Sequence, residues 1–116
     1  MTEFCIHIHP NRARDLDLAQ VRALCAALAR ERDLVRRHAV LEGLDHVPYV
    51  NLMFETERPD LLWSLIEQRL YRDGAVGGAL RASSMAMCQG TRGWDDYRLL
   101  HHYDPAVPAC NHSPAA

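Results

Sequence analysis

Two histidines near the start of the chain have a spacing that could hold a metal ion or transfer a proton. Residues 4–9 alternate between hydrocarbon side chains and side chains with a thiol or an imidazole, in the order Phe4-Cys5-Ile6-His7-Ile8-His9. Successive side chains of a β-strand point to opposite faces, so this alternation predicts a strand with one apolar face. His7 and His9 then share the other face, about 7 Å apart along the backbone, and both could reach one divalent cation.

A metal site built on this pair needs a third ligand. Glu55, in a later predicted strand, and His101 or its neighbour His102 are the candidates. Together with His7 and His9 they would suit Fe(II), Zn(II) or Mn(II) with open coordination positions, as in metal-dependent oxygenases and hydrolases. An isolated His-x-His pair is a weak motif, and the competing interpretation is an ordinary polar sheet face.

A second cluster of reactive residue types lies in one short segment, Gly90-Thr91-Arg92-Gly93-Trp94-Asp95-Asp96-Tyr97. Arg92 could hold a carboxylate or phosphate with two hydrogen bonds, Trp94 could stack on a ring, and Asp95 could act as a base. These three residues form a predicted ligand-binding site. The alternative is a hairpin loop in which the aspartates are solvated, because paired catalytic carboxylates usually come from separate elements.

Composition excludes several kinds of chemistry. All 13 basic residues are arginine, so a lysine Schiff base, a pyridoxal-phosphate anchor and a P-loop lysine are impossible. The net charge of -2 and the lack of a basic block argue against nucleic-acid binding. Hydrophobic residues make up 48% of the chain and charged residues 24%, which is ordinary for a globular domain.

The four cysteines and the chain start indicate where the protein works. Cys5, Cys25, Cys88 and Cys110 are far apart in sequence and form no C-x-x-C pair, so reduced thiols are expected. No apolar run reaches membrane-spanning length, and the first residues lack the pattern of a signal peptide. We therefore expect a cytoplasmic protein that does not enter a membrane.

The element after the first strand allows two interpretations. Asp17 is a natural N-cap with Gln20 at the third helical position, and residues 18–42 contain no Gly, Pro, Ser, Thr or Asn. This favours one long helix that ends at Gly43. In the alternative, the helix ends near Arg32, and residues 38–41 form a strand that makes a hairpin with the next one.

The remaining elements follow from alternation and from chain breakers. We predict strands over about 49–55, 83–89 and 97–103, and a helix that begins at Pro59 and ends at Asp73-Gly74. The glycine-rich residues 74–80 are predicted to form a loop. Residues 1–105 are expected to be a single domain, and residues 106–116, rich in Pro and Ala, a flexible tail.

These elements predict an α+β fold of order β-α-β-α-β-β, a two-layer sandwich with two helices on one face of a four-stranded sheet. The alternative is a ferredoxin-like order, β-α-β-β-α-β, with one added strand. In the two-layer sandwich, the face without helices is partly open and carries Tyr49, Asn51 and Met53 beside the histidines. The predicted function is a non-enzymatic module that forms a homodimer or binds a protein partner through this face, and the alternative is a small metal-dependent enzyme.

Overall fold

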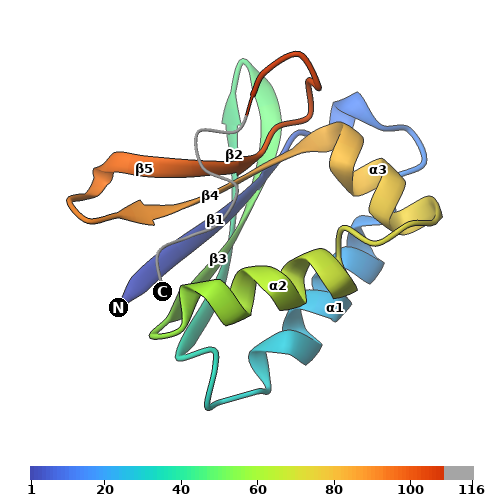
Figure 1. Ribbon diagram of the computed structural model, residues 1–116. Coiled ribbons are helices and arrows are strands. Elements are labelled where there is room, and N and C mark those ends of the chain that lie inside the picture. The colour runs from blue at the N-terminus through green and yellow to red at the C-terminus, as the bar shows by residue number, and fades with distance from the viewer. Residues whose placement is uncertain (109–116) are drawn as a thin grey trace.

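The computed structural model describes residues 1–108, which form an α+β fold (Figure 1). Five antiparallel strands form one sheet, and three α-helices accompany it. The elements in chain order are β1 (Thr2–Ile8), a 3-10 turn (Pro10–Arg12), α1 (Leu18–Ala29), β2 (Arg37–Asp45), β3 (Val47–Thr56), α2 (Pro59–Arg69), α3 (Ala75–Ser83), β4 (Ser84–Gly90) and β5 (Gly93–His101).

The strands lie in the order β2-β3-β1-β4-β5, and the expected sheet of four strands is wrong by one. The additional strand is β2, in a segment for which a long helix was the first expectation. The helix α1 ends at Ala29, and residues 37–45 pair with β3 through nine consecutive partners. The observed element order corresponds to the alternative prediction, in which a hairpin follows the first helix.

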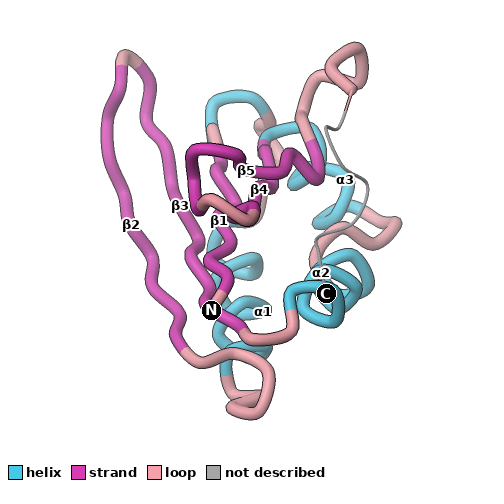
Figure 2. Tube along the Cα trace, turned by 60° about the vertical axis from the view of Figure 1, so that its left-hand side comes forward, coloured by secondary structure: helices cyan, strands magenta, loops and turns pink. Residues whose placement is uncertain are grey.

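The helices lie on one face of the sheet, and the other face carries no described helix (Figures 1 and 2). Helix α1 begins where expected, because the Asp17 side chain accepts a hydrogen bond from the backbone N–H of Gln20 at 3.0 Å. Helix α2 begins at Pro59, as predicted. Apolar stripes of the helices pack on the inward side chains of the strands, which include Phe4, Ile6, Ile8, Leu52 and Phe54.

The glycine-rich segment after α2 is a helix, where a loop was expected. Helix α3 buries Ala79 and Leu80 against the core and brings Gly77 against the backbone of Arg72. A side chain at position 77 would prevent this approach, so glycine here serves close packing. Glycine content alone was therefore misleading about this segment.

The prediction of a flexible tail concerns residues 106–116, and residues 109–116 of it lie outside the described part of the chain, together with Cys110. Residues 106–108 are exposed. Within residues 1–108, the helices are all too short or too polar to cross a lipid bilayer.

Candidate functional site

An apolar row crosses the open face of the sheet from one edge to the other. The strand register places one residue of each strand side by side, in the spatial order Ala39, Met53, Cys5, Met87 and Leu99. Cys5 lies between Phe4 and Ile6, which face the helices, so this row lies on the opposite face. Cys5 and Leu99 are buried, and the other three are partly exposed.

The next row of the same face adds apolar and polar groups. Its members, in spatial order, are Leu41, Asn51, His7 and Met85. Leu41 is 54% exposed. Met53 was predicted on this face, whereas the facing of Met85, Met87 and Leu99 depends on how β4 and β5 pair.

His7 and His9 lie together at one end of this face, as their spacing predicted. Their ring centroids are 4.6 Å apart in an edge-on arrangement. His7 Nδ1 donates to the side-chain carbonyl Oδ1 of Asn51 at 2.5 Å, and the Tyr49 ring lies 5.2 Å from the His7 ring. These contacts fix the His7 ring with its Nε2 away from Asn51.

The environment of His9 disfavours its positive charge. Burial, the neighbouring His7 and the charge of Arg12 lower the pKa of His9, and a hydrogen bond to the Pro48 backbone opposes them. The guanidinium of Arg12 lies 3.8 Å above the ring of Tyr103, which in turn meets His9 edge-on. His9 Nδ1 is buried without a hydrogen-bond partner. A neutral imidazole of this kind can act as a base or as a metal ligand.

Glu55 and His101, two of the predicted third ligands, lie away from the histidine pair. Glu55 is four residues beyond Asn51 on β3, about 13 Å along the strand. In the sheet it lies opposite Glu3 of β1 and Arg37 of β2. His101 lies on the helix side of the sheet, where its Nε2 donates to the Arg81 carbonyl oxygen at 2.9 Å. Within residues 1–108, His, Cys, Asp and Glu side chains form no group of three or more that could hold a metal ion.

The environment of His101 also disfavours its protonation. Burial lowers the pKa of His101, and the charges of Arg81 and His102 add to this effect, while its hydrogen bond to Arg81 opposes them. Its ring packs against Tyr71, with centroids 4.8 Å apart. These contacts indicate a packing role for His101 at the junction of β5 with the helices.

The residues of the predicted ligand site lie in the turn of the β4–β5 hairpin and at the start of β5. Trp94 Nε1 donates to Glu3 Oε1 at 3.0 Å and so lies at the border of the open face. Arg92 is exposed, with its Nε 4.0 Å from Asp96 Oδ2, and Asp95 is exposed. The Asp96 carboxylate accepts hydrogen bonds from the Arg92 N–H and from Thr91, which lower the pKa of Asp96. Asp96 thus fixes the turn.

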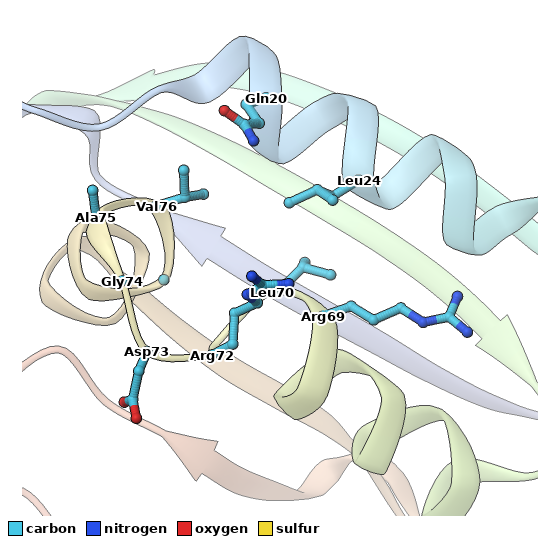
Figure 3. Close-up of a pocket in the computed structure, with 10 residues that line it drawn as sticks. Gln20, Leu24, Arg69, Leu70, Arg72, Asp73, Gly74, Ala75 and Val76 are labelled. Atoms are coloured by element: carbon cyan, nitrogen blue, oxygen red, sulfur yellow. The ribbon is translucent and has the colours of Figure 1, made fainter.

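Two pockets on the surface are candidates for binding a small ligand. One, of about 320 Å³, lies on the open face, and its lining combines Ala39, Leu41 and Met53 with the charged Glu3, Arg37 and Glu55. The other, of about 240 Å³, lies between α1 and the α2–α3 connection (Figure 3). Arg69 at its border is already paired with Glu31 at 3.2 Å, and Figure 3 shows its side chain extending away from Gly74.

Comparison with known proteins adds no family to this description: no family model, no curated protein and no solved structure matches the chain. The fold and the site define an α+β protein with an open, partly apolar sheet face and a histidine pair at one end of it.

Proposed function

We propose that this protein is a self-associating module whose open sheet face packs against the same face of a second copy. The apolar row across all five strands is the observation that supports this proposal. Apolar side chains gain free energy when a partner removes them from water. A row of this length on a face without a described helix is therefore best explained by a protein partner.

The layout of the face favours a second copy as that partner. The apolar row lies in the middle, with Glu3, Arg37 and Glu55 on one side and the histidine pair on the other. An apolar centre with a polar rim is the usual anatomy of a protein interface. A two-fold axis in the plane of the interface brings one apolar row onto the other, so that the patch complements itself. Met53 and Met87 have flexible side chains that can adapt to each other.

Replacing Met53 by glutamate tests this contact. Met53 is partly exposed, so the single chain can hold the new carboxylate in water, but a face-to-face contact would bury it without a partner. We expect the mass of the assembly to be halved, with a dissociation constant raised at least about tenfold. Sedimentation velocity across a range of concentrations measures this.

Leu61→Glu is the matched control, because Leu61 is an exposed apolar residue of α2 on the helix side. It should leave the mass unchanged. A wild-type protein that is monomeric at every concentration would contradict the proposal. So would a folded Met53→Glu variant with the wild-type mass.

A metal-dependent activity is the second candidate, and the adjacent rings of His7 and His9 support it. Both imidazoles could ligate one ion, with water or a group of a second copy at the remaining positions. The neutral state favoured for His9 is the state that binds metals.

This candidate predicts that Zn(II), Mn(II) or Fe(II) raises the melting temperature of untagged protein, and that His9→Ala removes the effect. His46→Ala is the control, because His46 is an exposed residue at the β2–β3 turn. Elemental analysis of the purified protein accompanies the titration. Metal-free protein with an unchanged melting temperature in all three metals would eliminate the candidate.

A further inference from the structure

The strand β2 forms one border of the sheet and has a free outer edge. It is last in the order β2-β3-β1-β4-β5, and within residues 1–108 no strand pairs with its outer side (Figure 2). It has nine residues, contains no proline, and keeps register with β3 without a bulge. A long, regular edge of this kind is a template for another strand.

The backbone groups that point outward can be identified. The Glu55 carbonyl of β3 accepts from the Arg36 N–H, and the Met53 carbonyl accepts from the His38 ring, so both point toward β2. Directions alternate along an antiparallel strand, and odd residues of β3 pair with odd residues of β2. The N–H and C=O groups of His38, Val40, Glu42 and Leu44 therefore point to the free edge.

We propose that β2 pairs antiparallel with β2 of a second copy about a two-fold axis at Leu41. In this register Val40 pairs with the partner's Glu42, and His38 with the partner's Leu44. These are the residues whose backbone groups point outward, so the hydrogen bonds of the edge are completed. The two copies then share one continuous sheet of ten strands.

Charge pairing favours this register over one in which the two β2 strands are shifted. Leu41 meets the partner's Leu41, and Arg37 meets the partner's Asp45 at both ends of the contact. Arg37 and Asp45 lie eight residues apart on one strand, about 26 Å, so they cannot pair within a chain. Arg37 makes no ion pair with any described residue, and Asp45 only faces His46 at 3.9 Å in an exposed position. A shift of the axis by one residue loses both charge pairs.

This contact is independent of the face-to-face contact proposed above. It uses the border of the sheet, while the other uses its surface, so both can form at once. Each proposal can therefore fail without the other.

A charge swap in the Met53→Glu background, where the face contact is removed, tests the edge contact. We expect Met53→Glu to sediment as a dimer, and the added change Arg37→Asp or Asp45→Arg to give a monomer. An equimolar mixture of the two double variants should form the dimer again, because each end of the contact then joins one arginine to one aspartate.

Arg37→Asp places a carboxylate opposite Glu55 of the same chain and could disturb β2 itself. A second pair of variants therefore tests the edge contact without changing a charge at position 37. Glu42→Pro removes an outward N–H and should dissociate the edge, whereas Glu42→Ala should not. A monomeric Met53→Glu protein beside a dimeric wild type overturns the edge contact and leaves the face contact standing. A mixture of the charge variants that stays monomeric also overturns it.

Discussion

Replacing Leu52 by alanine is expected to lower the free energy of unfolding by about 2–5 kcal/mol, and Ile66→Ala by a similar amount. Leu52 lies at the centre of β3 and Ile66 on the inner stripe of α2, and both are fully buried. Each truncation removes apolar contacts and leaves a cavity between the sheet and the helices. Denaturant unfolding followed by circular dichroism measures the loss.

Leu61→Ala provides the comparison, since Leu61 lies on the outer side of the same helix as Ile66. We expect it to change the free energy of unfolding by no more than about 0.5 kcal/mol. If Ile66→Ala left the denaturation midpoint at the wild-type value, the inward facing of α2 would be wrong. The same outcome for Leu52→Ala would contradict the facing of β3.

Replacing Gly77 by alanine is expected to lower the free energy of unfolding by about 1–3 kcal/mol, although alanine is the better helix former. A Cβ at position 77 would overlap the carbonyl oxygen of Arg72, which is backbone and cannot swing aside. The variant must therefore displace the α2–α3 connection. Thermal and denaturant unfolding measure the loss.

The neighbouring Gly78 makes a stringent control. A Cβ there has no atom of another part of the chain within 4 Å, so Gly78→Ala should raise the free energy of unfolding by about 0.5–1 kcal/mol. Opposite signs at two adjacent glycines of one helix would support the packing of α3. Equal effects at both positions would contradict it.

The elements with strong local signals could be predicted from the sequence. The alternation through residues 4–8 indicated both the strand and its inward face, and Phe4, Ile6 and Ile8 are buried. The N-cap Asp17 and the proline Pro59 correctly predicted where α1 and α2 begin. These features depend on neighbours in the sequence, which is why local patterns were sufficient.

Local patterns could not decide between β2 and a longer helix, and they could not predict the helix α3. Residues 30–42 contain no helix breaker, and the strand is stabilised by its nine pairs with β3, which no local pattern reports. In α3 the glycines suggested a loop, yet Leu80 is buried in the core and Gly77 fits against Arg72. Tertiary packing outweighed intrinsic propensity in both segments.

The candidate site was predicted in part for the same reason. The pairing of His7 with His9 follows from a spacing of two on one strand. The positions of Glu55 and His101 depend on the register between strands and on the irregular pairing of β4 with β5. The apolar row likewise combines one residue from each of five strands, so its existence became evident only in the folded sheet.

Oxidation of the methionines by dilute peroxide, followed by mass spectrometry, tests the face-to-face contact most directly. Met53, Met85 and Met87 lie on the open face, and Met1, which is 69% exposed, is an internal reference. As protein concentration rises, the oxidation rates of the three methionines should fall relative to that of Met1, because the partner covers them. Ratios that stay constant while sedimentation shows assembly would contradict the contact.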